Sequence, residues 1–370
     1  MALVLTINTS FSVLRTRFCI GLALTLPLMA GHLSAAEVDQ FSQLPDVELQ
    51  DSSALLNAEV EQRIERALVR ANRNAPHLKP RKVQRVPEQS RCNVDRLYDS
   101  FRVLLARPII GQVESFAQQS PKVSRLSMPL QESIYRDFTW PDSPSLVLSE
   151  RVAAVVRVGD DFVGTDKFGH FFTEGYSYFL ETDRLKSPLN KAFLFGEWTE
   201  SVYFGAETTG VYSFADLVAN FNGLRFWNRI LADHPDPMTD RADVPYVRCQ
   251  SDKWVAAADF DWRDYVDPAW NESVNCSMMR TLGLLEKVLN TGPVCRPDML
   301  PWKRYGELAP RLFNQQGLAV LPEYLQPEVI LTQRHPDMMT ESRVLWLKGV
   351  REWLEEWRIR QDVEREGRDL

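Results

Sequence analysis

The sequence lacks the short motifs of several common enzyme classes. It has no Gly-x-Ser-x-Gly nucleophile elbow, no His-Glu-x-x-His pair, no glycine-rich phosphate loop and no dinucleotide-binding fingerprint. Each of these motifs uses its spacing to place a nucleophile, a metal ion or a phosphate group. Their absence disfavours hydrolases and nucleotide-binding enzymes of those types.

The sequence also lacks a surplus of positive charge. It has 43 Lys and Arg against 50 Asp and Glu, a formal net charge of -7. Proteins that bind nucleic acid need a basic surface to neutralise phosphates. We therefore expect no nucleic-acid partner, and a small-molecule ligand or a protein partner stays open.

Long apolar runs are absent except near the N-terminus. Two arginines there precede an apolar run of about 14 residues, Phe18–Gly31, and small residues follow at positions 34–36. This pattern predicts a signal peptide over residues 1–36, cleaved before Glu37. The competing interpretation is a retained membrane anchor, but the run is shorter than the ~20 residues that a spanning helix needs. We expect an exported chain that does not span a membrane after cleavage.

Four of the five cysteines would remain after cleavage, and none forms a Cys-x-x-Cys pair. A zinc knuckle is therefore disfavoured. An even number of cysteines in an oxidising compartment predicts two disulfides, with the connectivity open. These cysteines are Cys92, Cys249, Cys276 and Cys295.

The apolar spacing is mostly helical, and strand signals are few and short. We predict a mainly α fold, a helical bundle-like domain with few or no strands. Residues 37–90 would form an N-terminal helical extension and linker, and residues 91–370 the main helical domain. Helices are expected from Ser53 and Asn93 onward, around residues 273–290 and from residue 341 to the C-terminus.

The central motif region, residues 160–230, predicts three helices joined by short turns. In the first, Asp166, His170 and Glu174 recur every four residues on one face, opposite phenylalanines. The second, from about residue 190 to 207, sets glutamates opposite an apolar stripe. The third opens at Ser213 with Asp216 in the capping-box position. We expect one shared core, made of Phe168, Phe172, Trp198, Val202, Leu217, Val218 and Phe221.

Facing one cleft, the three polar stripes would assemble a general acid–base site or a hard-metal site for a divalent cation. The alternative is a set of helix caps, at Asp166 and Asp216, and ordinary solvated faces. The candidate catalytic residues are His170, Glu174 and Glu200. The candidate metal ligands are Asp166, His170, Glu174, Glu200 and Asp216. The other motif positions are Lys167, Glu197, Glu207, Asn220 and Gly223.

The order Asp166-Lys167-x-x-His170-Phe171, then Glu197 and Glu200, then Ser213-x-x-Asp216-Leu217-x-x-Asn220-x-x-Gly223 resembles two bacterial envelope families over residues 160–225. These are the YfiM-like lipoproteins and, more weakly, the VanZ-like proteins. VanZ-like proteins span the membrane, whereas this chain has no further segment of that kind. The resemblance implies a location in the cell envelope rather than a reaction.

Two functions from different classes follow from these observations. The first is a periplasmic or otherwise exported envelope factor that binds a lipid, a glycan or a protein partner through a polar cleft between helices. Its association with a membrane stays open. The second is a metal-assisted or acid–base enzyme that acts on an envelope substrate with His170 and the clustered carboxylates. The sequence leaves open whether the protein is an enzyme.

Overall fold

The computed structural model describes residues 48–73, 92–107 and 111–279. The last range has short gaps at 134, 137–138, 141–142, 144–145, 147–151, 185, 187, 190–191, 194–195, 197–198, 201–204, 206–208 and 273–276. Every described residue belongs to one compact unit. The predicted signal peptide, the predicted linker from residue 74 onward and the helix predicted from residue 341 lie outside the described residues. The helix predicted around residues 273–290 is wrong where it is described, because Met278–Met279 form a β-strand.

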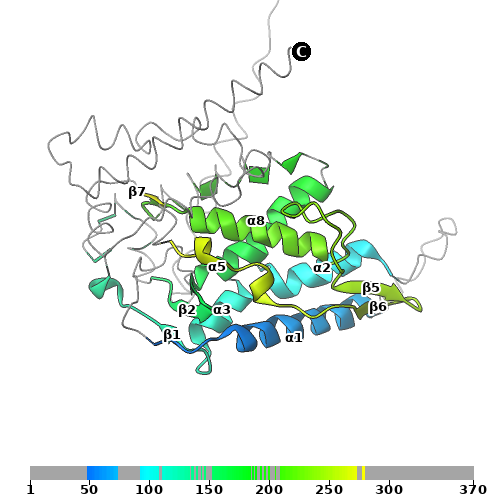
Figure 1. The fold of residues 1–370 in the computed structure, drawn as a ribbon, viewed down its shortest axis with the longest axis horizontal. Helices are drawn as coiled ribbons and strands as arrows, with labels where there is room; N and C mark the ends of the chain where they lie inside the picture. The colour runs from blue at the N-terminus through cyan, green and yellow to red at the C-terminus, as the bar shows by residue number, and fades with distance from the viewer. Residues whose placement is uncertain are drawn as a thin grey trace, which may run out of the picture. The chain divides into compact units, whose positions relative to one another are not determined.

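The two predicted N-terminal helices are confirmed, and they pack against each other (Figure 1). Helix α1, Ser53–Asn72, buries Leu56, Val60 and Ile64 at helical spacing. Helix α2, Val94–Leu105, begins at the predicted cap, where the Asn93 side chain accepts a hydrogen bond from the backbone of the third helical residue. A shorter helix, α3 (Gln112–Gln119), contacts both.

The first and third helices of the central region are also confirmed. Helical segments follow one another without a break from Asp166 to Arg184 and form what we call the central helix. They are α5 (Asp166–Gly169), the π-helical η2 (His170–Glu174), α6 (Gly175–Phe179) and the π-helical η3 (Leu180–Arg184). Helix α8, Phe214–Arg229, packs along η2 and α6. Only isolated residues of the predicted second helix are described, among them Glu200 in helical conformation.

The prediction of a mainly α bundle is wrong, because helices and antiparallel strands are mixed. One sheet has the order β1-β2-β3, with β2 (Val155–Val158) and β3 (Asp161–Gly164) paired through Val156 and Val163. Two-stranded sheets join β5 to β6 and β4 to β7. The strands have two to four residues, too few for periodicity to separate them from buried helix. The remaining elements are β1 (Arg125–Leu126), β4 (Val211–Tyr212), β5 (Val247–Gln250), β6 (Lys253–Ala256), β7 (Met278–Met279), η1 (Leu130–Glu132), η4 (Trp262–Asp264) and η5 (Pro268–Trp270).

An aromatic core forms where the central helix meets α8 and the segment that follows β6. The ring of Phe171 lies 4.9 Å from that of Trp262 and 5.5 Å from that of Phe226. Of the predicted core, Phe168, Phe172, Val218 and Phe221 belong to one buried cluster and Leu217 is buried. Trp198 and Val202 lie outside the described residues.

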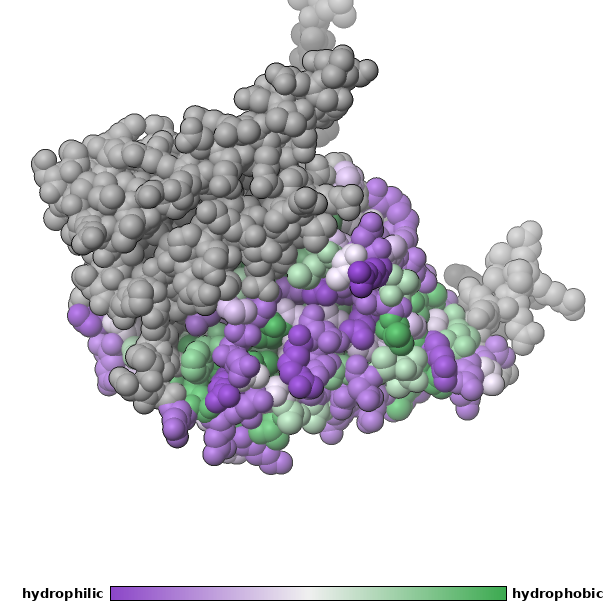
Figure 2. Space-filling model, in the orientation of Figure 1, coloured by the Kyte–Doolittle hydropathy of each residue, from purple (hydrophilic) through white to green (hydrophobic). Residues whose placement is uncertain are grey.

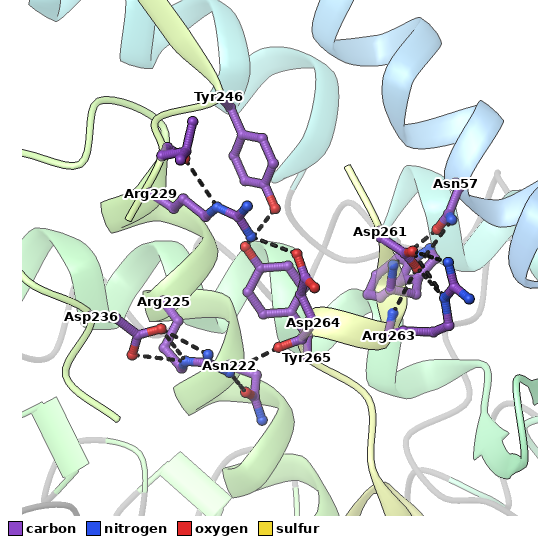
Figure 3. A network of polar contacts seen from close by, with 12 residues as sticks. Asn57, Asn222, Arg225, Arg229, Asp236, Tyr246, Asp261, Arg263, Asp264 and Tyr265 are labelled. Atoms are coloured by element: carbon purple, nitrogen blue, oxygen red, sulfur yellow. Dashed lines mark hydrogen bonds and ion pairs between the residues drawn. The ribbon is translucent and has the colours of Figure 1, made fainter. Parts of the chain in front are cut away.

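Segments that follow α8 in the chain are held to the helix by polar contacts (Figure 3). Arg225 forms an ion pair of 2.7 Å with Asp236, which lies in the loop after α8. Arg229 pairs with Asp264 at 2.6 Å and lies over the ring of Tyr246. These contacts fix the following segments against this side of α8.

One disulfide joins Cys92, at the start of α2, to Cys249 in β5, 157 positions further along the chain. This confirms one of the two predicted bridges. Cys276 and Cys295 lie outside the described residues. On the face drawn in Figure 2, hydrophilic residues are interspersed with apolar ones. Within the described part of the chain, no helix is long and apolar enough to cross a membrane.

Candidate functional site

A lysine ammonium lies at the centre of a group of carboxylates inside the protein. The Lys167 side chain is fully buried, and its Nζ lies 2.7 Å from Asp166 Oδ2 and 2.5 Å from Glu272 Oε1. It also contacts Asp216 Oδ1. A buried cation is tolerated only when such partners replace its water. These residues, with the neighbouring His170, Glu200 and Asn220, form what we call the polar cluster.

Separate elements bring the polar cluster together. Asp166 and Lys167 begin the central helix directly after β3, and His170 follows one turn later. Asp216 lies in the first turn of α8. Glu272 follows η5, whose contact with α8 brings it to the same place. The cluster therefore depends on tertiary packing and not on any single helix.

His170 bridges the first two turns of α8. Its Nε2 lies 3.2 Å from Asp216 Oδ2 and its Nδ1 lies 3.2 Å from Asn220 Oδ1. A neutral imidazole has one donor and one acceptor nitrogen, yet both nitrogens here face oxygen. Either Asp216 carries a proton and donates it to Nε2, or the Asn220 amide is turned so that its nitrogen donates to Nδ1. In either case both ring nitrogens of His170 face a polar partner on α8.

The electrostatics of the cluster favour protonated carboxyl groups and a neutral imidazole. Burial raises the pKa of Asp216 to about 7 and that of Asp166 to about 6, although the positive charge of Lys167 opposes both shifts. Burial, helped by the Lys167 charge, lowers the pKa of His170 to about 4. One ammonium cannot keep every surrounding carboxyl ionised, so the cluster holds protons near neutral pH.

Glu200 is buried beside the start of α8. Its Oε1 accepts a hydrogen bond of 2.9 Å from the backbone N–H of Ser213. Burial and the negative charge of Asp216 raise its pKa well above the usual range. Ser213 in turn accepts a hydrogen bond of 3.2 Å from the backbone N–H of Asp216 through its Oγ.

The sequence-predicted residues divide into three groups. Asp166, Lys167, His170, Glu200, Asp216 and Asn220 are all buried in the polar cluster. Glu174 lies at its edge, with 19% of its side chain exposed and its Oε2 3.9 Å from His170 Nδ1. Glu197 and Glu207 lie outside the described residues.

Two expectations about these residues need correction. Asp166 and His170 do not lie on a solvated face, because both are buried. The polar residues of α8 do not lie on one either, because α8 is buried on nearly every side. His170, expected outside the core, is only 5% exposed. Gly223 has a packing role, since a Cβ there would lie 1.9 Å from the carbonyl oxygen of Phe171.

The sequence interpretation missed Glu272, which follows a short 3-10 turn and has no periodic neighbour. The only available signal was the charge balance, because a buried Lys167 needs carboxylates. Oxygens of Asp166, Asp216 and Glu272 lie within 4.8 Å of one another, a spacing that a metal ion can use. The Lys167 ammonium contacts all three carboxylates, so the chain's own cation lies where a metal would bind. The divalent metal stays a prediction.

Comparison of the chain with protein-family models, curated proteins and solved structures finds no match. The resemblance to YfiM-like and VanZ-like proteins therefore stays a prediction.

Proposed function

We propose that the polar cluster is an acid–base site in an exported cell-envelope protein, with His170 as the group that transfers the proton. The observation that carries this proposal is the position of the His170 ring between two hydrogen-bonding oxygens. An imidazole held in this way has a fixed orientation. It can accept a proton at one ring nitrogen and release a proton from the other.

The neighbours of His170 would have separate roles. Asp216 orients the ring and exchanges a proton with Nε2, and Lys167 holds Asp216 in place. Glu174 lies on the Nδ1 side and is the most exposed carboxyl near the ring. A proton would thus pass between the buried Asp216 and the partly exposed Glu174 by way of His170. Groups of perturbed pKa that meet in this way are common at functional sites.

Export is supported by the N-terminal pattern and by the Cys92–Cys249 disulfide. Disulfides form and persist in oxidising compartments and are rare in the cytosol. We therefore propose a periplasmic or otherwise exported protein whose mature chain begins near Glu37. N-terminal sequencing of the protein isolated from cells tests this, and an intact residue 1–36 segment on a cytosolic protein contradicts it.

One observation favours a second function. His170 is only 5% exposed, so a substrate would have little direct access to its ring. The polar cluster would then stabilise a protein that binds a lipid, glycan or protein partner of the envelope without catalysis. This is the binding function expected from the sequence.

The variant His170→Gln separates the two functions. The oxidised mature chain is incubated with isolated cell envelopes, and small molecules released into solution are measured by mass spectrometry. If the site is catalytic, we expect release by the wild-type protein and at least ~100-fold less by the variant, a typical contribution of acid–base catalysis. His234→Gln is the matched control, because His234 is exposed and pairs with Asp183 away from the cluster.

Circular dichroism and a thermal melt establish that each variant is folded. Equal release by folded His170→Gln and wild-type protein contradicts the acid–base proposal. Envelope binding without release, unchanged in the variant, supports the binding function instead.

A further inference from the structure

The first turn of α8 has an unusual division of hydrogen bonds. The spacing Ser213-x-x-Asp216 predicts a capping box, in which each residue's side chain bonds the other's backbone N–H. Half of the box is present, because Ser213 Oγ accepts the N–H of Asp216 at 3.2 Å. The other half would need the Asp216 carboxylate to accept the Ser213 N–H.

Glu200 takes that second place. Its Oε1 accepts the Ser213 N–H at 2.9 Å, so the Asp216 carboxylate is not needed as the acceptor of that N–H, although the Ser213 side chain stays beside it. Asp216 Oδ1 contacts the Lys167 ammonium, and Oδ2 lies 3.2 Å from His170 Nε2. The capping role therefore falls to a residue more than ten positions earlier in the chain.

Close packing fixes the Glu200 carboxyl. A Cβ on Gly205 would lie 2.3 Å from Glu200 Oε1 and 2.1 Å from the Glu200 carbonyl oxygen. Both distances are shorter than real carbon contacts, so a Cβ at position 205 would force Glu200 to shift. Glu200 itself is 2% exposed, and water does not readily replace it at the Ser213 N–H.

From this geometry we infer that Glu200 is a positioning residue. It satisfies the N-terminus of α8 and thereby leaves Asp216 to orient His170. The inference rests on the proposed acid–base site for its functional meaning, but the geometry stands on its own. Without Glu200 the buried Ser213 N–H would lack an acceptor, which is costly. The spacing of Asp216 from Ser213 lets its carboxylate replace Glu200 as the acceptor. The Asp216 carboxylate would then lose its contact with His170 Nε2.

The test compares Glu200→Ala with Glu200→Gln in the full oxidised chain labelled with ¹⁵N-histidine. A glutamine oxygen can still accept the Ser213 N–H, so we expect Glu200→Gln to keep the wild-type NMR shifts of the His170 ring nitrogens. Glu200→Ala should shift the Nε2 resonance, because Asp216 turns back toward Ser213. Unchanged Nε2 in Glu200→Ala overturns the inference. An equal shift in both variants also overturns it, since it shows that the carboxyl group itself matters and not its role as hydrogen-bond acceptor.

Gly205→Ala gives a second route if Glu200→Ala does not fold. The added Cβ displaces the Glu200 carboxyl, so the same Nε2 shift is expected, and its absence in a folded variant contradicts the inference. Envelope activity is measured in parallel. Normal release by His170→Gln together with a shifted Nε2 in Glu200→Ala would reject the acid–base function and keep the positioning role.

Discussion

At the scale of the residue, Lys167 decides the character of the site. Its ammonium is fully buried and is shared among Asp166, Asp216 and Glu272. Buried ion pairs add little net stability over apolar packing, but removing one partner leaves uncompensated charge. Lys167 therefore keeps a surplus of carboxyl groups inside the protein.

We predict that Lys167→Met destabilises the protein by about 3–5 kcal/mol at pH 7, the usual effect of breaking a buried charge pair. Urea unfolding followed by circular dichroism measures this. The loss should be smaller at pH 5, because Asp166 and Asp216, with pKa values of about 6 and 7, then take up protons. Lys122→Met is the control, since Lys122 is exposed on a turn. Equal stability of Lys167→Met and wild type would show that the ammonium does not hold the cluster together.

Spacing alone predicted part of this site. Asp166 and His170 lie four positions apart, as do Asp216 and Asn220, so each pair had to share a helix face. Spacing could not show that these faces are buried, since a polar stripe is usually solvated. Nor could it show Glu272, because no periodicity links a loop residue to a helix.

At the scale of the element, the crossing of the central helix and α8 positions the cluster. A Cβ on Gly175 would lie 2.5 Å from Gly223 Cα, so the two backbones touch at this point. The indole N–H of Trp227 donates to the carbonyl of Phe172 across the same interface at 3.0 Å. This close approach brings Asp216 and Asn220 within reach of His170. Periodicity predicted both helices, but their distance depends on two glycines.

We predict that Gly223→Ala destabilises the protein by about 1–3 kcal/mol, the cost of overpacking a core. The sign is the informative part, because glycine to alanine within a helix ordinarily stabilises by about 1 kcal/mol. The new Cβ meets the Phe171 carbonyl oxygen, a backbone atom that cannot turn away. Thermal and urea unfolding measure the effect. A more stable variant would mean that the helices separate easily, and the cluster geometry could not then depend on their contact.

The strands show the limit of pattern reading at this scale. The segment that becomes β2 and β3 has a run of valines and a turn at Gly159, where φ is +62°. Such a turn favours glycine and is typical of a hairpin. The valines and the glycine turn indicate a hairpin, but the pattern is only a few residues long. The helical spacing on both sides of it favours a helical fold instead. Pairs such as β4 with β7 join segments far apart in the chain, and local sequence does not indicate them.

At the scale of the whole molecule, long-range links hold the site within one framework. The disulfide joins α2 to the β5–β6 hairpin, and β5 begins where the backbone N–H of Val247 donates to the Ile230 carbonyl just beyond α8. Cross-links that close long loops restrict the unfolded chain most. The cysteine count predicted bridges but not their pairing, because pairing is a property of the fold.

The polar cluster also makes stability depend on pH. Asp216 has a pKa of about 7 in the folded protein against 3.8 as its ordinary value, so the folded state binds its proton more tightly. Its contribution to stability is complete below pH 4 and is lost as the pH rises through 7. His170 acts in the opposite sense, since its pKa falls from 6.5 to about 4, and its contribution is lost as the pH falls through 4.

We therefore predict that the stability difference between wild type and Asp216→Asn changes with pH in favour of the variant as the pH rises from 5 to 8. The slope should approach about 1.4 kcal/mol per pH unit where one extra proton is bound in the folded state, and it should level off above pH 7. Because His170 is present in both proteins, subtraction largely removes its opposing effect. Urea unfolding at a series of pH values measures the difference. A difference that is constant, or that favours the wild type as the pH rises, would mean that Asp216 is ionised throughout and that Lys167 outweighs burial at this carboxyl.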